Sequence, residues 1–372
     1  MSIEQLIIDL EQEVQNDNVN KQVEGDLALY TYSPLCNYRG AWNETTKQAR
    51  GLIIDLKNKR IAARPFRKFF NMGETIETHY NHLPKGEVEI TTKMDGSLGT
   101  IFYYAGQWRV ATKGSFKSDQ AVWATNRLNS GRYNLDWLVP SFTYLCEIIY
   151  PDNKVVVDYR GLEDLTMLAI VDTENGYEYP RTDVNFADLE EAGFNLVEMH
   201  HGKTIDELLR LKEVLDHHNE GWVVRFLKNN MRVKIKTDAY VKVHRIISEC
   251  TPLGIWRALE DGRVKEEIVV NIPEEIRPDF NRIKDALEKQ YNDILKRAKD
   301  IANEITPKGW DSTNPTKEGM KSVALQLQSY SDSDTIKSCV FALVKNKTDS
   351  IDQTIMQAIR PNENNIDRGE DV

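Results

Sequence analysis

The stretch TTKMDGSLGT, residues 91–100, places one lysine between two segments that are typical of β-strands. EVEI (87–90) alternates as a strand does, and GTIFYY (99–104) is rich in β-branched and aromatic residues. The Asp95-Gly96 pair favours a tight turn, but such a turn does not require a preceding lysine. Two interpretations follow: a hairpin with an exposed lysine, or a reactive lysine held at a strand end.

The segments around this stretch indicate the fold of the first two thirds of the chain. From about residue 25 to 240, short strand-like runs alternate with turn signals, and helical spacing is clearest in TIDELLRLKEVLDHH (204–218). The connections between the strands are too short for crossover helices. The sequence therefore predicts an α+β domain of largely antiparallel sheets over residues 1–243.

The pattern changes after about residue 243. Apolar residues recur at helical intervals in DFNRIKDALEKQYNDILKRAKDIANEI (279–305), DTIKSCVFALVKN (334–346) and SIDQTIMQAIR (350–360). We expect a separate all-α domain over residues 244–360. The polar residues 361–372 are typical of a disordered tail.

Composition excludes several classes of protein. No apolar run approaches the roughly 18 residues that span a bilayer, and the N-terminus lacks the basic start of a signal peptide. The four cysteines lie far apart without a C-x-x-C pair, which favours reduced thiols in the cytoplasm. We therefore expect a cytoplasmic protein with no membrane role.

Charge is unevenly distributed although the formal net charge is −10. Between residues 47 and 68 a single acid, Asp55, accompanies eight cations: Lys47, Arg50, Lys57, Lys59, Arg60, Arg64, Arg67 and Lys68. Such a basic stripe binds a polyanion or forms a solvated face, and the run alone does not distinguish these interpretations.

Three further elements are unusual for a plain sheet protein. Glu147 lies inside the apolar run LCEII, and Glu220-Gly221 precedes the apolar strand WVVRF. Lys234 and Lys236, at positions i and i+2, share one face of a strand. Two cations facing a core would be unfavourable, whereas two cations facing a bound anion would be stabilised.

In this order, KMDG (93–96), Glu147, Glu220-Gly221 and KIK (234–236) resemble motifs I, III, IV and V of the covalent nucleotidyltransferases, which include ligases and capping enzymes. Five stretches are similar to the bacteriophage RNA ligase 1 family: ARGLIID (49–55), ARPFRKFFNM (63–72), TKMDGSL (92–98), TKGSFKSDQA (112–121) and KIKTDAYV (234–241). The resemblance covers roughly residues 30–240. A helical region follows it, as in that family, instead of the OB-fold expected of capping enzymes and DNA ligases.

The resemblance implies an ATP-dependent RNA ligase. ATP would donate AMP to the lysine, with Mg²⁺ or Mn²⁺ as the metal. The AMP would then pass to a 5′-phosphate RNA end, which a 3′-hydroxyl end would attack. The expected substrate is RNA with these two ends, such as a broken tRNA, and the helical domain would select it. A monomer that works beside an end-healing polynucleotide kinase/phosphatase is also expected.

The resemblance further assigns roles by matching position. The implied catalytic residues are Lys93, Asp95, Gly96, Glu147, Glu220, Lys234 and Lys236. The implied nucleotide-binding residues are Tyr32, Arg50, Lys68, Lys93, Lys113, Glu147, Val223, Lys234 and Lys236, although Val223 is equally consistent with a core valine. The implied metal ligands are Glu147, Glu220, Glu266 and Glu267, the last two of which also suit a solvated helix face.

Elementary chemistry agrees with a lysine nucleophile among cations. With a pKa of ~10.4, only about one free lysine in 2,500 is unprotonated at pH 7. Neighbouring Lys234, Lys236 and a bound Mg²⁺ would lower the pKa of Lys93 and stabilise charge on the phosphoryl oxygens. Gly96 would permit close backbone approach to a nucleotide.

Two alternatives share parts of this pattern. A GTP-using mRNA capping guanylyltransferase has the same lysine chemistry, but the expected OB-fold signals are missing. A non-catalytic RNA-binding descendant would retain the fold, although the complete set of lysines and glutamates argues against it.

Overall fold

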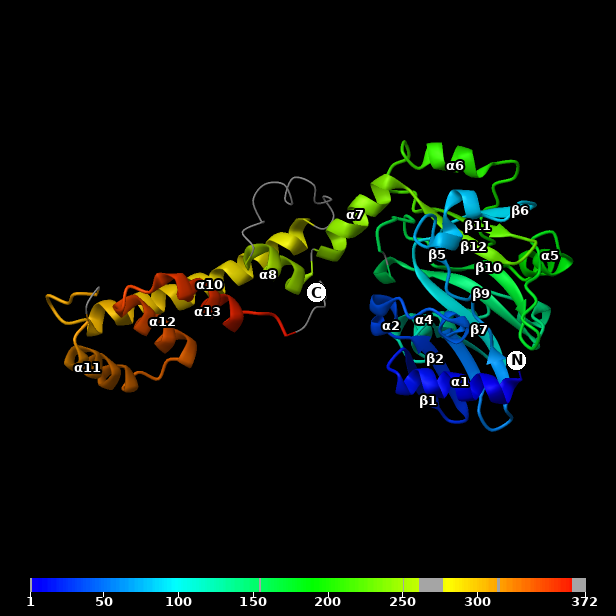
Figure 1. The fold of residues 1–372 in the computed structure, drawn as a ribbon. Helices are drawn as coiled ribbons and strands as arrows, with labels where there is room; N and C mark the ends of the chain where they lie inside the picture. Colours follow the sequence, from blue (N-terminus) through cyan, green and yellow to red (C-terminus); the bar gives the residue numbers. More distant parts are fainter. Residues whose placement is uncertain (1, 154, 250, 261–276, 313–314, 363–372) are drawn as a thin grey trace. The chain divides into compact units, whose positions relative to one another are not determined.

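The computed structural model describes residues 2–153, 155–249, 251–260, 277–312 and 315–362 (Figure 1). The chain divides into two compact units, Met1–Val241 and Lys242–Val372. We call them unit 1 and unit 2 and describe each by itself. The domain boundary expected after residue 243 falls inside helix α7 (Asp238–Glu249).

Unit 1 contains three four-stranded sheets within its described residues. In spatial order, the first sheet consists of β1 (Val19–Glu24), β2 (Leu27–Tyr32), β3 (Arg50–Asp55) and β4 (Arg60–Ala63). The second consists of β10 (Asp164–Asp172), β9 (Phe142–Ile149), β7 (Ser97–Tyr104) and β8 (Gln107–Thr112). The third consists of β5 (Phe70–Asn71), β12 (Met231–Lys236), β11 (Gly221–Phe226) and β6 (Val88–Thr92). Neighbouring strands are antiparallel except for the short parallel pair β5–β12, which confirms the predicted α+β class.

Helices cover the three sheets. In unit 1 they are α1 (Ile3–Gln15), α2 (Pro34–Arg39), α3 (Glu44–Gln48), α4 (Asp119–Leu128), α5 (Val184–Glu191) and α6 (Ile205–Leu211). Helix α1, whose N-terminus is capped by the Ser2 side chain, buries Leu6 and Leu10 against the first sheet. Helices α4 and α5 pack on the second sheet, and Leu208 of α6 packs on the third. The first and second sheets share a further apolar layer that includes Leu29 and Phe102.

Helix α6 is shorter than the sequence pattern predicts. Thr204 and Glu207 form its capping box, but the helix ends at Leu211 rather than continuing to residue 218. Beyond it, the Asp216 carboxylate accepts a hydrogen bond from the backbone N–H of His218. This side-chain contact favours a turn at residues 216–218, which the sequence pattern had placed in the helix.

Strand register in the third sheet brings distant residues to one edge. Thr92, the last residue of β6, lies opposite Trp222 of β11, and Gly221 lies opposite Lys236 of β12. The backbone N–H of Lys93 donates to the carbonyl of Gly221 at 2.8 Å. Lys93, Glu220 and Lys236 are therefore neighbours at the same end of the sheet.

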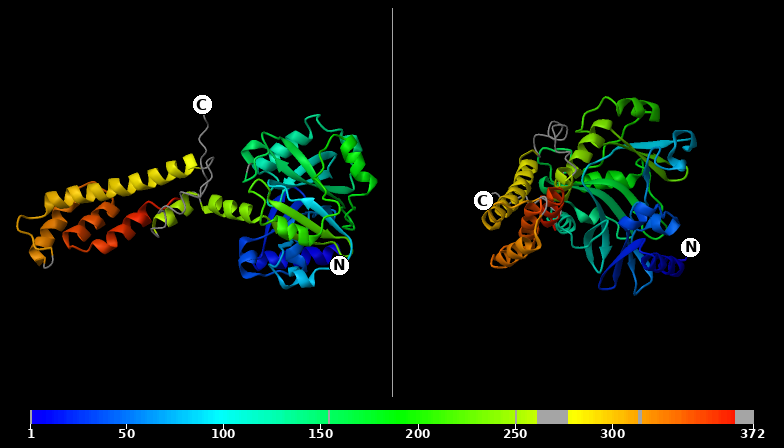
Figure 2. Two further views of the ribbon diagram at one scale, coloured as in Figure 1. Left: turned by 90° about the horizontal axis from the view of Figure 1, so that it is seen from above. Right: turned by 60° about the vertical axis from the view of Figure 1, so that its left-hand side comes forward.

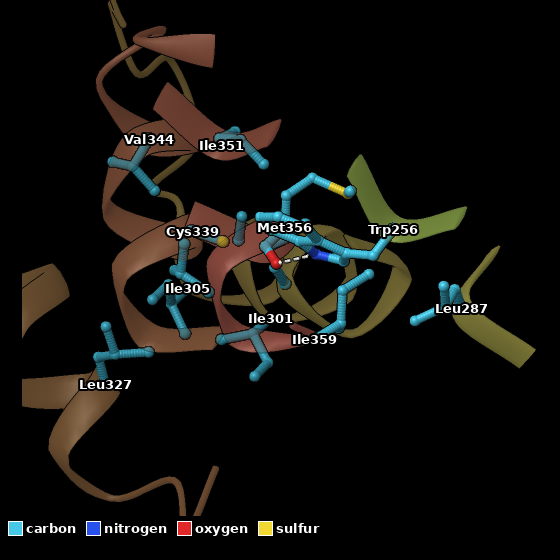
Figure 3. Packing of buried hydrophobic residues seen from close by; sticks show 14 of the residues in the cluster. Trp256, Leu287, Ile301, Ile305, Leu327, Cys339, Val344, Ile351, Met356 and Ile359 are labelled. Carbon is cyan, nitrogen blue, oxygen red and sulfur yellow. Dashed lines mark hydrogen bonds between the residues drawn. The ribbon is translucent and has the colours of Figure 1, made fainter. Parts of the chain in front are cut away.

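Unit 2 is helical over its described residues, as predicted. Its helices are α8 (Pro252–Glu260), α10 (Arg277–Ile305), α11 (Lys317–Gln328), α12 (Asp334–Val344) and α13 (Ile351–Ala358). Helices α10, α12 and α13 lie side by side (Figure 1, Figure 2). In the core of this unit, the indole N–H of Trp256 donates to the carbonyl of Met356 at 2.7 Å among buried residues such as Ile301 and Ile359 (Figure 3). This separate apolar core accounts for the division of the chain. Residues 363–372 of the predicted tail lie outside the described residues.

Gly221 is the glycine on which the third sheet depends, and we predict that Gly221→Ala destabilises unit 1 by about 2–4 kcal/mol. Its φ is +135°, and an added Cβ would lie 2.0 Å from the carbonyl oxygen of Ile235. Gly106, with a φ of +83° and open space around it, is the matched control. Gly106→Ala adds only backbone strain of about 1–2 kcal/mol. Denaturant unfolding measures both, and equal losses would contradict the predicted clash.

Candidate active site

A cavity of about 520 Å³ in unit 1 gathers residues that are far apart in the sequence. Its size is in the range of small-ligand pockets. We call it the main cavity. Eight of the residues named from the sequence line it: Tyr32, Arg50, Lys93, Lys113, Glu147, Val223, Lys234 and Lys236, and Gly96 contributes backbone. The structure therefore brings together most of the residues to which the sequence assigned one site.

The carboxylate of Glu220 joins two of the lysines. Its Oε2 accepts from Lys93 Nζ at 2.7 Å, and its Oε1 lies 2.9 Å from Lys236 Nζ. The Glu220 side chain is only 3% exposed, whereas Lys93 is 20% exposed. A buried carboxylate with two cationic partners is well compensated. Glu220 thus holds both ammonium groups in place from behind the main cavity.

Glu147 is the second carboxylate near Lys93. Its Oε1 accepts from the backbone N–H of Gly96 at 3.0 Å. Burial raises the pKa of Glu147 to about 7, and the negative charge of Glu220 adds to the effect, while Lys93 opposes it. An added Cβ at Gly96 would lie 2.6 Å from the carbonyl of Ile148. The glycine therefore allows the lysine-bearing turn to approach the strand that carries Glu147.

Lys234 lies in a cluster of cations. Burial, together with the positive charges of nearby Arg50, Lys68, Lys93 and Lys236, lowers the pKa of Lys234 to about 7. Lys234 Nζ and the Arg50 guanidinium both contact the ring of Phe69, at 5.2 and 5.1 Å from its centroid. The Nη1 atom of Arg50 is buried without a hydrogen-bond partner. Such a cluster is suited to a multiply charged anion, which would satisfy these donors.

Lys68 is held by aromatic side chains. Its ammonium lies 5.3, 4.8 and 5.0 Å from the ring centroids of Tyr32, Trp42 and Phe70. Lys113 shares the Tyr32 ring, at 4.6 Å. Lys68 itself does not line the main cavity but a neighbouring groove. Because cation–π contacts orient a charge without neutralising it, Lys68 remains available to an anion.

Asp95 has a different position from the other motif residues. It is buried and does not line the main cavity. Its Oδ2 accepts from the backbone N–H groups of Val156 and Val157, both at 2.8 Å, and its Oδ1 accepts from the Tyr240 hydroxyl at 2.7 Å. Asp95 therefore fixes the turn that follows Lys93, which makes it a positioning residue in this structure.

A family model described as RNA ligase, that of the bacteriophage RNA ligase 1 family, matches residues 48–240, just over half of the chain. The chain belongs to the RNA ligase 1 family. The resemblance read from the motifs is thereby confirmed, and the matched region contains all the described motif residues except Tyr32.

Named relatives of the chain include other RNA ligases. A protein named RNA ligase from Rhodothermus phage RM378 is 24% identical, covering 86% of this chain and 85% of its own length. A putative RNA ligase from Thermovibrio ammonificans is 29% identical over 53% of each chain. A putative bifunctional polynucleotide kinase/RNA ligase of Autographa californica nuclear polyhedrosis virus is 24% identical over 61% of this chain. The matches span about half of the bacterial relative and 35% of the baculovirus one.

A solved structure shares the fold of this RNA ligase 1 family member. It is described as an archaeal ATP-dependent RNA ligase, with a TM-score of 0.50 and 16% sequence identity, and the match covers 91% of this chain and 95% of that one. At this identity the likeness concerns the fold alone. In the described part of the chain, no helix is long and apolar enough to cross a membrane.

The metal ligands expected in this family member are only partly described. Glu266 and Glu267 lie outside the described residues. Among the described residues, no group of three or more His, Cys, Asp or Glu side chains gathers as a metal cluster. Glu147 and Glu220 nevertheless suit Mg²⁺, which is commonly held by one or two carboxylates together with substrate phosphates.

The structure adds residues that the motifs did not indicate. The Phe69 ring contacts both Arg50 and Lys234, and Trp42 completes the aromatic surroundings of Lys68. At the far end of the main cavity, Arg225 forms an ion pair with Glu89 at 2.9 Å. Arg181 lines the same end, with two buried nitrogen atoms that have no hydrogen-bond partner. Of these residues, only the aromatic ones were indicated by the sequence, because they lie close to the basic stripe in the chain.

Lys234 supplies a pH-dependent test of the cation cluster. Its native pKa of about 7 lies below its ordinary value of 10.5. Between these two pH values, the unfolded chain therefore binds more protons than the native chain. The free energy of unfolding of the wild type consequently increases as the pH rises from about 7 to 10.5. We predict that Lys234→Met is more stable than wild type, with the largest difference below pH 7 and a shrinking difference towards pH 10.

Urea unfolding over a pH series measures the Lys234 effect. Lys234→Arg is the matched control, because arginine keeps its charge throughout this range and should bring no gain in stability. A Lys234→Met advantage that does not vary with pH would show that its cause is packing rather than the buried charge.

Proposed function

We propose that this chain is an ATP-dependent RNA ligase that joins 5′-phosphate and 3′-hydroxyl RNA ends through lysyl-AMP and RNA-adenylate intermediates. The observation that carries the proposal is Lys93, which lies in the main cavity among Arg50, Lys113, Lys234 and Lys236. The family membership and the named RNA ligase of the phage relative support it. The archaeal neighbour is described as ATP-dependent.

In the first step, the unprotonated amine of Lys93 attacks the α-phosphorus of ATP. A nitrogen–phosphorus bond forms, the bond to the bridging oxygen breaks, and pyrophosphate leaves. The ammonium of Lys93 must first lose a proton, and Glu220 Oε2, at 2.7 Å, is positioned to accept it. With that proton on Oε2 the Glu220 side chain is neutral, and Lys236 Nζ, 2.9 Å from Oε1, still donates a hydrogen bond to it.

The cations of the main cavity and Lys68 would bind the triphosphate of ATP. Arg50 Nη1 and Lys234 have no salt-bridge partner within the described residues, and the Lys68 ammonium is close enough to lower the pKa of Lys234. Phosphate oxygens would satisfy all three and would favour the charged form of Lys234. When bound beside Glu147 and Glu220, Mg²⁺ or Mn²⁺ would neutralise phosphate charge as a Lewis acid.

Two further transfers complete the reaction. An oxygen of the RNA 5′-phosphate attacks the phosphorus of lysyl-AMP, the nitrogen–phosphorus bond breaks, and Lys93 leaves as the amine. A 3′-hydroxyl then attacks the RNA 5′-phosphorus, a phosphodiester bond forms, and AMP leaves with the electrons of the broken pyrophosphate bond while the hydroxyl proton is released. Only the first two transfers need the Lys93 nitrogen.

We predict that Lys93→Ala abolishes covalent labelling by α-labelled ATP and all sealing of 5′-phosphate RNA. It should still seal RNA that already carries the 5′–5′ AMP, because that step needs no lysine nucleophile. Lys57→Ala, at an exposed lysine of the basic stripe, is the matched control and should label as wild type does.

Labelling by GTP instead of ATP would indicate capping chemistry, and no label from either nucleotide would indicate an RNA-binding module. Adenylate found on a residue other than Lys93 by mass spectrometry would contradict the assignment.

The natural substrate belongs to the same proposal. We propose broken tRNA, sealed by a monomer in the cytoplasm after an end-healing kinase/phosphatase has prepared the ends. The baculovirus relative, whose name combines a polynucleotide kinase with an RNA ligase, supports such a pairing of activities. Unit 2, which holds none of the described motif residues, would select the RNA.

We predict that a truncation ending near residue 245 still forms lysyl-AMP and seals simple single-stranded RNA. It should lose the preference for a structured substrate such as nicked tRNA, because that preference is assigned to unit 2. Circular dichroism and cooperative unfolding check that the truncated chain is folded. Full preference in a folded truncation would contradict the role of unit 2.

A further inference from the structure

A groove of about 940 Å³ in unit 1 lies beside the main cavity. Phe66, Phe69, Glu178 and Arg232 line both. We call this second space the side groove. Its cationic lining consists of Lys47, Arg64, Arg67, Lys68 and Arg232, and its acidic lining of Glu44, Glu77 and Glu178.

The β3–β4 hairpin places half of the cations of the basic stripe in the side groove. Strands β3 and β4 form a hairpin, so the residues before β3 and after β4 lie at the same end. The backbone N–H of Lys68 donates to the carbonyl of Lys47 at 2.7 Å and ties these segments together. Lys57 lies at the opposite end, in the turn of the hairpin, and does not line the groove. Half of the stripe therefore faces one concave surface.

Of the cations in the side groove, Arg232 is paired with the buried carboxylate of Glu178, whereas Lys47, Arg64 and Arg67 are only weakly neutralised. Arg64 donates to the backbone carbonyls of Thr173 and Glu174, which leave its charge intact. Arg67 pairs with Glu44 at 2.6 Å, but these side chains are 52% and 71% exposed. Lys47 reaches the exposed Glu77 only at 3.9 Å. Exposed ion pairs contribute about 0–1 kcal/mol, so a phosphate group can replace these carboxylates at little cost.

We propose that the side groove holds the phosphate backbone of a single RNA strand whose 5′-phosphate enters the main cavity. The inference rests on the proposed ligase function. Basic side chains beside an apolar wall, here Phe66 and Phe69, are typical of single-strand binding surfaces. Because Phe66 and Phe69 line both spaces, the groove lies directly beside the cavity that contains Lys93, where the RNA end must meet lysyl-AMP. Cations along this path also offset the repulsion between two phosphate-bearing ligands.

The test measures each half-reaction separately in charge variants of the full chain. Lysyl-AMP enzyme is isolated, and transfer of AMP to a short 5′-phosphorylated single-stranded RNA is followed in a single turnover. Lys47→Glu and Arg67→Glu should each lose about tenfold more in this transfer than in lysyl-AMP formation. The loss should shrink as salt is raised, because the missing contacts are electrostatic.

Two comparison variants make the result specific. Lys57→Glu changes the net charge equally on the same stripe but outside the side groove, and should behave as wild type. Glu44→Gln frees Arg67 from its carboxylate and should speed AMP transfer to RNA, a gain that a purely structural role of Arg67 would not produce. Thermal unfolding checks that every variant is folded.

Other outcomes would overturn the inference. Equal effects of Lys57→Glu and Arg67→Glu would show that only net charge matters. If the variants instead slow the return of AMP from lysyl-AMP to added pyrophosphate, the side groove serves the leaving group. If wild type forms no lysyl-AMP, the proposed function itself fails. Direct binding of labelled RNA to wild type, Arg67→Glu and Lys57→Glu then still decides whether the groove binds a strand.

Discussion

The Glu220 carboxylate, shared between Lys93 and Lys236, is the interaction on which the site depends. It is buried, so each of its oxygens needs a cationic partner, and each lysine needs it in return. The contact exists only because β6, β11 and β12 are paired in one register. The positive φ of Gly221 brings the backbone of β11 close to β12 directly after Glu220. The register of the sheet therefore also determines the position of Lys93.

Several other polar groups of the main cavity are buried without full electrostatic or hydrogen-bond compensation. Lys234 has a pKa lowered by burial, Glu147 has one raised by burial, and Arg50 has an unpartnered nitrogen. Each feature costs stability in the free protein, and a nucleotide with its metal would relieve all three. Such a concentration of unfavourable charge is typical of functional sites rather than of structural ion pairs. By contrast, Arg225 and Glu89 neutralise each other at the far end of the same cavity.

Local patterns predicted the motif residues because strand periodicity is local. Lys234 and Lys236 share a face by the two-residue repeat, and Glu147 was conspicuous within an apolar run. Trp42, Phe69 and the role of Asp95 could not be predicted in this way. They depend on contacts between segments that are distant in the chain, such as Trp42 with Lys68 and Asp95 with Tyr240. The helical pattern likewise continued to residue 218, where the structure has a turn with a hydrogen bond from the His218 backbone to Asp216.

The basic stripe shows why topology must be added to composition. Its eight cations all lie within residues 47–68, yet the β3–β4 hairpin separates them into two groups at opposite ends of the hairpin. Arg50 lines the main cavity, Lys68 lines the side groove, and Lys57 faces solvent. The sequence left a polyanion site and a solvated face as alternatives, and the fold divides the run between the main cavity, the side groove and the exposed turn of the hairpin. A chain with a net charge of −10 can thus concentrate positive potential where two phosphate-bearing ligands would meet.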